Sequence, residues 1–418
     1  MILSKPYITY TGNNVRLCSD VKVNEDMVTV YFEVDREFEN YLVTERIDSF
    51  YIALLPYAME HNLDVVCEEV LSEKLYYNTV VYYIPGLSER LKYFYNINVT
   101  AKTTQEAVKS EKKAGTGISN GVDSLYSILR HMNTGLETYD ISYTVLMNTG
   151  GCDPEGGEKS QKWFKGKIEE IKPVMKELNK KLLCIDTNLM EFYGEDHTHS
   201  GTFRMCGCIL ALQKLFSTYY IGAGYAMDEV QVSVDNAAYD FLNVQCASSE
   251  GLTFYSSGLE VSRLDKVKYI SDFPVTYNSI SVCLDGFKNC SHCEKCLRTM
   301  GELYAINKLD LYRPSFDVDD FYKKKKLRIA EIIARKSIPT KYSKFNKKKY
   351  PDIVQSYYKE ILAEMKKNGI KVPFISRILA VLYIKPREYL RSKLRTSVLA
   401  RKIYFKITKK VDEHPIIK

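Results

Sequence analysis

A chain of 418 residues is too long for one ordinary hydrophobic core, so its length predicts two or three domains. Hydrophobic residues make up 45% of the chain, which excludes wholesale disorder. The net charge of +7 is the sum of two opposite contributions. Residues 1–320 contain 31 Lys and Arg and 45 Asp and Glu, a net charge of −14. Residues 321–418 contain 28 Lys and Arg and 7 Asp and Glu, a net charge of +21. This asymmetry predicts an anionic partner at the C-terminal end.

The eleven cysteines do not indicate a disulfide framework. The chain is large, it begins Met-Ile-Leu-Ser-Lys without the apolar core of a signal peptide, and four cysteines cluster in one short stretch. The longest apolar run near the end, 378–384, is too short to span a bilayer. We therefore expect a protein of the reducing cytoplasm.

Residues 1–104 are expected to form an α+β N-terminal domain without a catalytic constellation. The segments with the β-branched and aromatic composition of strands are 28–34, 64–67 and 93–99. The expected helices are 47–59, bent at Pro56, and 75–84. The polar stretch 103–113 is expected to be a linker.

Residues 110–310 are expected to form an α/β domain with a parallel sheet. From Ala114 onward, strand-like segments alternate with helical ones, which implies a parallel sheet covered by helices on both faces. The expected strands begin at 114 and then occupy 141–147, 182–185 and 218–221. The expected helices follow Ser124 and then occupy 159–179 and 202–216.

A polar turn, Ser119-Asn120-Gly121-Val122-Asp123-Ser124, follows the first of these strands. Such a turn lets the backbone approach phosphate closely, and the helix behind it directs its free N–H groups and positive dipole end at the anion. The turn also lies at the carboxyl edge of its strand, where open α/β sheets bind ligands. The alternative is an ordinary turn in which Ser119 or Asp123 caps the helix.

Ser-Asn-Gly-Val-Asp-Ser resembles the Ser-Gly-Gly-x-Asp-Ser signature of the PP-loop ATP pyrophosphatases, which cleave ATP between the α and β phosphates. Asn120 stands at the second position of this signature, where that family usually has a glycine, and asparagine tolerates the left-handed conformation. The resemblance implies an adenine nucleotide alpha hydrolase-like domain in which residues 119–124 bind ATP, with Mg²⁺ offsetting the phosphate charge. It also implies catalytic roles for Asp123 and Ser124.

Other residues near the expected sheet edge are candidates for the same site. Arg263 and Lys266 are three apart and would share a helix face. In the PP-loop family, basic residues after the last core strands often reach ATP phosphate, although an exposed basic helix start is the alternative. Gly222-Ala-Gly224 is either a contact for the base or ribose or a tight turn. His197 and His199 are expected to be polar loop residues and not metal ligands.

Four cysteines are spaced as metal ligands: Cys283, Cys290, Cys293 and Cys296. A short C-x-x-C-x-x-C run with a fourth thiol before it fits the closed tetrahedral site that thiolates form with Zn²⁺. The alternatives are an iron–sulfur cluster, a redox pair and unliganded thiols. No proline follows the run, as it does in bacterial ferredoxins. His292 could replace one thiol, although four cysteines already complete the shell.

A PP-loop signature followed by a late four-cysteine knot is similar to the 7-cyano-7-deazaguanine synthases, the nitrile-forming enzymes of deazaguanine biosynthesis. The similarity covers about residues 110–305, and those compact enzymes have no counterpart of the N-terminal domain or the basic tail. It implies an enzyme that adenylates a carboxylate or amide oxygen of a small-molecule substrate, releases pyrophosphate and transfers nitrogen. A tRNA-modifying PP-loop sulfur transferase and a non-catalytic nucleotide-binding module are the alternatives.

Residues 311–418 are expected to form a basic helical region. One helix is expected over 352–368, with Pro351 before it and Gly369 at its end. A second, basic and amphipathic, is expected over 386–407. Such a region binds RNA or an anionic membrane surface, or it packs on the acidic body of its own chain. The sequence does not indicate an oligomeric state.

Overall fold

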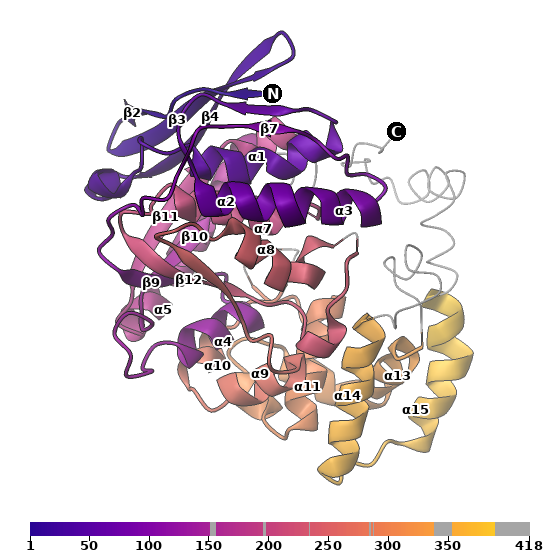
Figure 1. Ribbon diagram of the computed structural model, residues 1–418. Helices are drawn as coiled ribbons and strands as arrows, with labels where there is room; N and C mark the ends of the chain where they lie inside the picture. Colours follow the sequence, from indigo (N-terminus) through magenta and orange to yellow (C-terminus); the bar gives the residue numbers. More distant parts are fainter. Residues whose placement is uncertain are drawn as a thin grey trace. The chain divides into compact units, whose positions relative to one another are not determined.

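The computed structural model describes residues 1–150, 156–194, 198–233, 235–283, 286, 288–337 and 353–388. The chain forms two compact units. Figure 1 labels their helices and strands. The first comprises Met1–Cys296 and Leu311–Phe316, and the second comprises Leu297–Asp310 and Asp317–Lys418. The domain boundary expected near residue 104 thus falls inside the first unit.

Most of the described strands of the first unit form one large sheet, in the order β13-β12-β9-β10-β11-β4-β3-β1-β5-β7, with β2 also paired to β3. These strands are β1 (Ile2–Leu3), β2 (Tyr7–Thr11), β3 (Asn14–Val23), β4 (Asp26–Asp35), β5 (Val65–Cys67), β7 (Val99–Thr100), β9 (Lys113–Gly117), β10 (Ile141–Met147), β11 (Lys181–Thr187), β12 (Phe216–Gly222) and β13 (Thr253–Ser257). A separate pair joins β6 (Leu71–Ser72) to β8 (Thr103–Thr104).

The α/β class with a mostly parallel central sheet is confirmed. Strands β13, β12, β9, β10 and β11 all pair in parallel. The N-terminal strands continue this sheet, because β4 pairs antiparallel with β11 through Asp186↔Glu33 and Thr187↔Phe32. This junction rests on two residue pairs between segments far apart in the chain, which no local pattern predicts.

The strand order creates a topological switch point beside β9. The chain places β10 and then β11 on one side of β9, and β12 and then β13 on its other side. In such sheets the connections leave in opposite directions from two neighbouring strands, and a crevice forms beyond their carboxyl ends. Here the switch point lies between β9 and β12.

Helices cover both faces of the parallel strands (Figure 1). Helices α4 and α5 pack on one face, with α9 packed against α4, while α7 and α8 cover the other face and α7 in turn packs on α1. The helices of the first unit are α1 (Asp48–Glu60), α2 (Glu73–Asn78), α3 (Ile84–Arg90), α4 (Val122–Arg130), α5 (Gly157–Glu177), α6 (Leu189–Tyr193), α7 (Gly201–Leu210), α8 (Asp240–Ala247), α9 (Arg263–Ile270) and α10 (Val275–Ser279), with a π-helical turn at Thr79–Tyr83. Helix α1 contains Pro56, as expected.

Two sequence-based boundaries were wrong for identifiable reasons. The helix expected over 202–216 ends at Leu210, and Phe216 already begins β12. The buried side chains of Leu212 and Leu215 extend the apolar pattern through the connecting turn. In the strand expected over 93–99 only Val99 belongs to a strand, and Phe94 and Ile97 are buried without a partner strand.

The described residues of the second unit form helices, as the sequence predicts for this region. Its helices are α12 (Val318–Lys323), α13 (Lys325–Arg335), α14 (Ile353–Lys367) and α15 (Phe374–Leu379), which continues as a π-helical turn at Ala380–Ile384, and α11 (Glu294–Ala305) contains the boundary between the units. The predicted helix 352–368 is confirmed as α14, after which Gly369 adopts a φ of +69°. The helix expected over 386–407 lies almost entirely outside the described residues. Within the described residues, no helix combines the length and apolarity needed to cross a membrane.

Candidate nucleotide site and metal centre

The Ser119–Ser124 turn connects β9 to α4 at the switch point. Asn120 adopts the left-handed conformation, with a φ of +58°. The Ser119 N–H donates to Ser124 Oγ at 3.3 Å, and that hydroxyl donates to the Gly121 carbonyl at 3.1 Å. Gly121 is the N-cap residue and contributes no side chain to the first N–H groups of α4. The positive end of the helix dipole therefore lies at the turn, where it favours an anion.

Two basic side chains converge on the carboxylate of this turn. Lys266 Nζ lies 3.1 Å from Asp123 Oδ1, and Arg263 Nη1 lies 3.5 Å from Asp123 Oδ2. Both basic residues come from the first turn of α9. The Lys266 side chain is only 2% exposed, and it also donates to the Ala223 carbonyl at 2.5 Å. The structure thus brings together three expected site residues from segments about 140 residues apart.

Two glycines make room for this arrangement. Gly258 has a φ of +85°, and a Cβ atom there would lie 2.7 Å from Lys266 Cε. A Cβ atom at Gly222 would lie 3.3 Å from the backbone oxygen of Asp123. The chain at the ends of β12 and β13 can approach α4 and Lys266 this closely because these residues lack side chains. The contact at Gly222 favours the tight-turn interpretation of residues 222–224.

Polar side chains of α5 contact the turn through Asn120. Asn120 is fully buried, its Nδ2 lies 3.5 Å from Glu170 Oε1, and its Oδ1 has no hydrogen-bond partner among the described residues. Lys167 of α5 donates to both Glu170 oxygens, at 2.9 and 2.8 Å, and to Ser281 Oγ at 3.1 Å. Sequence reasoning missed Lys167, because nothing local distinguishes this buried lysine from the exposed ones on the same helix.

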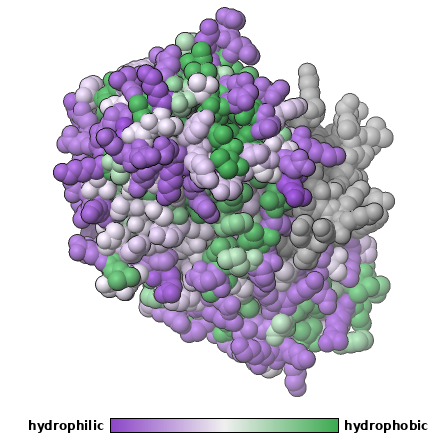
Figure 2. Space-filling view, in the orientation of Figure 1, coloured by the Kyte–Doolittle hydropathy of each residue, from purple (hydrophilic) through white to green (hydrophobic). Residues whose placement is uncertain are grey.

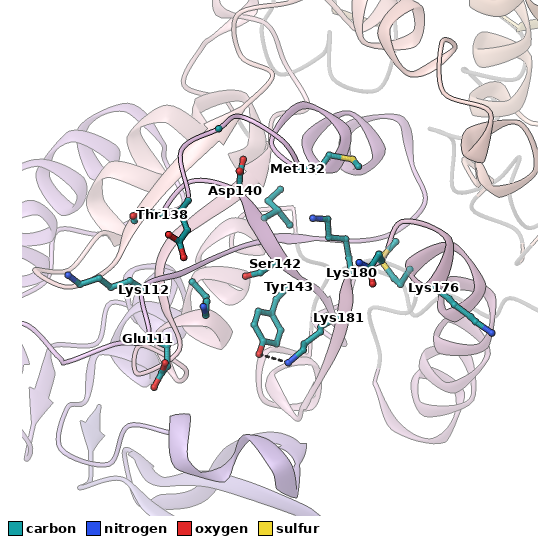
Figure 3. Close-up of a pocket in the computed structure, with 16 residues that line it drawn as sticks. Glu111, Lys112, Met132, Thr138, Asp140, Ser142, Tyr143, Lys176, Lys180 and Lys181 are labelled. Carbon is teal, nitrogen blue, oxygen red and sulfur yellow. Dashed lines mark hydrogen bonds between the residues drawn. The ribbon is translucent and has the colours of Figure 1, made fainter.

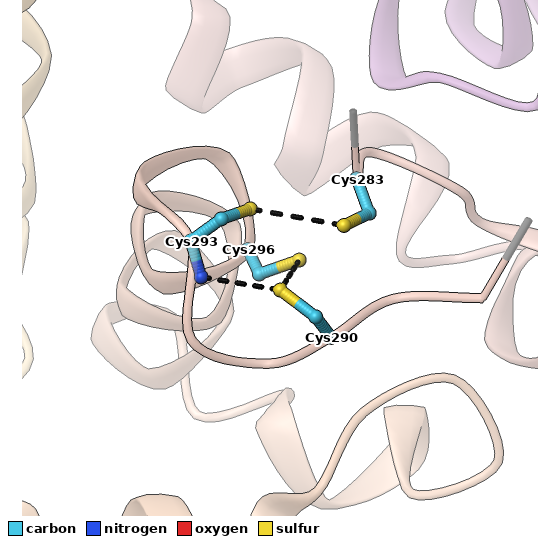
Figure 4. Close-up of side chains that lie close together, drawn as sticks. All are labelled: Cys283, Cys290, Cys293 and Cys296. Atoms are coloured by element: carbon cyan, nitrogen blue, oxygen red, sulfur yellow. Dashed lines mark hydrogen bonds between the residues drawn. The ribbon is translucent and has the colours of Figure 1, made fainter. Parts of the chain in front are cut away.

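The four cysteines lie together (Figure 4), and their Sγ atoms are all within 4.8 Å of one another. The Sγ atoms of Cys283 and Cys293 are 3.9 Å apart, and those of Cys290 and Cys296 are 4.0 Å apart. Four sulfurs placed about 2.3 Å from a zinc ion form a tetrahedron with edges of about 3.8 Å. This group could therefore hold a metal ion such as zinc. His292 is not part of the group.

The surroundings of Cys290 and Cys293 favour the thiolate, the form that binds metal, whereas the hydrogen bond with Cys293 raises the pKa of Cys296. The backbone N–H groups of His292 and Cys293 donate to Cys290 Sγ at 3.4 and 3.2 Å. Hydrogen bonding from the Cys296 thiol lowers the pKa of Cys293 to about 5. Four protein ligands would leave no open coordination position, which is typical of a structural metal site and not of a catalytic one.

A cavity of about 1070 Å³ lies at the amino ends of the parallel strands, at the other end of β9 from the turn (Figure 3). Its lining includes Lys113, Ile141 and Lys181, which begin β9, β10 and β11. The length of β9 places this cavity about 13 Å or more from the turn. Since parallel sheets bind ligands beyond the carboxyl ends of their strands, we place the candidate site at the turn and not in this cavity.

Of the two loop histidines, only His199 lies in the described part of the chain. His199 Nδ1 forms a hydrogen bond with Glu60 Oε1 at 2.5 Å, and its ring stacks on Tyr93 with the ring centroids 4.0 Å apart. Among the described residues, the only group of three or more potential metal-ligand side chains close together is the four-cysteine group. His197 lies outside the described residues.

No protein-family model matches this chain, and no curated protein or solved structure shows significant similarity to it. The resemblance to the PP-loop enzymes therefore rests on the turn and the cysteine spacing alone. Membership of that superfamily, with its nucleotide chemistry, stays a prediction.

Proposed function

We propose that the chain binds ATP at the Ser119–Ser124 turn and transfers AMP to a carboxylate or amide oxygen of a second, small-molecule substrate. The observation that carries this proposal is the convergence of Lys266 and Arg263 on Asp123 at the N-terminus of α4. Backbone N–H groups, a helix dipole and two cationic side chains meet there at the switch point of a parallel sheet. This combination suits a polyphosphate.

In the proposed reaction, the substrate oxygen attacks the α-phosphorus of ATP and the bond to the bridging oxygen of the β-phosphate breaks. The leaving pyrophosphate carries the developing negative charge. The N–H groups of the turn, together with Lys266 and Arg263, would stabilise this charge. Bound Mg²⁺ would offset further phosphate charge. A nitrogen nucleophile then displaces AMP from the activated substrate.

For the four-cysteine group we propose zinc as the metal and a structural role. Its thiolates would be Cys283, Cys290, Cys293 and Cys296, as expected from their spacing. The segment before Cys283 contacts the turn through Ser281. A metal on the cysteines would therefore fix the position of one wall of the nucleotide site.

Calorimetric titration with ATP tests the assignment of the site. Lys266→Met keeps most of the side-chain volume and removes the charge, so we expect ATP affinity to fall by about tenfold to a hundredfold, as for loss of a charge-assisted hydrogen bond. Lys268→Met is the matched control, because Lys268 lies on the same helix and pairs instead with Asp265 at 3.1 Å. If both variants bind ATP like the unaltered protein, the site is misplaced.

A further inference from the structure

The α15 segment, Phe374–Ile384, packs on α13 through one stripe of buried side chains. Ser376, Ala380 and Ile384 recur every fourth residue and are buried. Ala380 and Ile384 form a cluster with Ala330 and Ala334 of α13, and Ser376 Oγ donates to the Lys326 carbonyl at 2.8 Å. The inner face of this segment is therefore narrow and already occupied.

Five other apolar side chains of this segment are exposed, whereas Ile384 and Leu379 belong to the contact with α13. Phe374 is 76% exposed and Leu382 is 73% exposed. Val381, Tyr383 and Ile375 are exposed by 55%, 50% and 42%. Hydrophobic side chains reach the surface in the region where Figure 1 labels α15 (Figure 2). We call these five side chains the apolar ridge. Contiguous exposed apolar side chains of this kind mark an interaction surface.

Basic residues border the apolar ridge. Residues 371–388 contain four basic residues (Lys371, Arg377, Lys385 and Arg387) and a single acidic one, Glu388. Arg377 and Arg387 are exposed. Residues 321–418 as a whole carry a balance of +21, from 28 Lys and Arg against 7 Asp and Glu. The ridge thus combines exposed aliphatic side chains with positive charge.

We propose that the apolar ridge inserts into the surface of a bilayer that contains anionic lipids. Aliphatic side chains such as Leu382 and Val381 gain from transfer into the acyl region, while the basic border lies against the headgroups. RNA fits this surface less well, because bases stack on aromatic side chains and offer little to aliphatic ones. Since no described helix can span a membrane, the segment would lie in the plane of the interface. This inference is independent of the proposed nucleotide chemistry.

Flotation of the full-length protein with vesicles tests the proposal. We expect binding to phosphatidylcholine vesicles that contain about one third phosphatidylserine, and much weaker binding to pure phosphatidylcholine. The double variant Phe374→Ser/Leu382→Ser should bind at least about tenfold more weakly, because two exposed apolar side chains can no longer insert. The control is Met27→Ser/Leu136→Ser, which replaces two residues of the first unit that are each 60% exposed. Thermal melting establishes that both variants are folded.

A fluorescent reporter separates insertion at the ridge from attachment elsewhere. The chain has a single tryptophan, Trp163, so Trp163→Phe combined with Phe374→Trp places the only indole on the ridge. We expect its emission to shift to shorter wavelength with anionic vesicles and to be quenched by brominated acyl chains. Unquenched emission in vesicle-bound protein would overturn the proposal. So would unchanged vesicle binding by the ridge variant, binding of RNA without binding of vesicles, or self-association that the ridge variant abolishes.

Discussion

The backbone N–H of Ser281 donates to the carbonyl of Asn120 at 2.8 Å. Ser281 lies two residues before Cys283, so this bond connects the four-cysteine group to the proposed phosphate turn. Lys167 reinforces the connection, because its ammonium group bonds both Ser281 Oγ and the Glu170 carboxylate beneath Asn120. The metal centre and the nucleotide site are therefore expected to depend on each other.

Loss of the metal should therefore weaken both folding and ATP binding. Cys293→Ser removes one of four ligands, and we expect the free energy of unfolding to fall by on the order of 4 kcal/mol. Cys184→Ser is the control, because Cys184 is a free cysteine of intermediate exposure outside the group. Elemental analysis should find one zinc per chain in the control and none in Cys293→Ser. Iron with visible absorbance, or no metal in the unaltered protein, would contradict this account.

Gly258→Ala should displace Lys266. The added methyl group would meet Lys266 Cε at 2.7 Å at a backbone φ of +85°. Gly135→Ala is a matched control, since Gly135 has a φ of +78° with no atom within 4 Å of an added Cβ. Both substitutions incur the strain of a left-handed alanine, about 1–2 kcal/mol. Only Gly258→Ala should also weaken ATP binding, and equal ATP affinities in calorimetry would refute the role of this glycine.

Asp240 should make stability depend on pH. Burial raises the pKa of Asp240 from its ordinary value of 3.8 to about 7, against the hydrogen bonds from Thr202 and Asn243. Between these values the folded protein holds a proton that the unfolded chain has released, so stability falls as pH rises from about 4 to about 7 and then levels off. Asp240→Asn keeps the accepting oxygen and has no charge to bury. It should therefore be more stable than the unaltered protein at pH 8, by at most about 4 kcal/mol.

Chemical denaturation at a series of pH values measures this difference. The two proteins should have nearly equal stability near pH 4, where both side chains are neutral, and diverge as the pH rises. Parallel stability curves across the whole range would show that Asp240 does not titrate between pH 4 and 7.

Features encoded by local patterns could be predicted from the sequence. Strand β10 occupies the expected residues 141–147 because its apolar run ends at clear turn residues. Asn120 adopts the expected left-handed conformation. The cysteine group forms from residues at most 13 positions apart, so their spacing alone indicates their proximity.

Features that depend on distant segments could not be predicted. The pairing of β11 with β4 joins residues far apart in the chain, such as Asp186 and Glu33, which are separated by 153 positions. Burial of Lys167 depends on Ser281, which lies 114 positions away. The resemblance to the PP-loop enzymes indicated Arg263 and Lys266, but only the fold places both against Asp123. The nucleotide role of these residues remains a prediction.

Identification of the phosphate products tests the central claim most directly. ATP labelled at both the α and γ phosphates would be incubated with the protein and a small-molecule extract that supplies the acceptor. We expect labelled AMP and labelled pyrophosphate, and neither product with Asp123→Ala, which removes the carboxylate between Lys266 and Arg263. ADP and inorganic phosphate as the products would contradict the account, because the bond broken would then be the one between the β and γ phosphates.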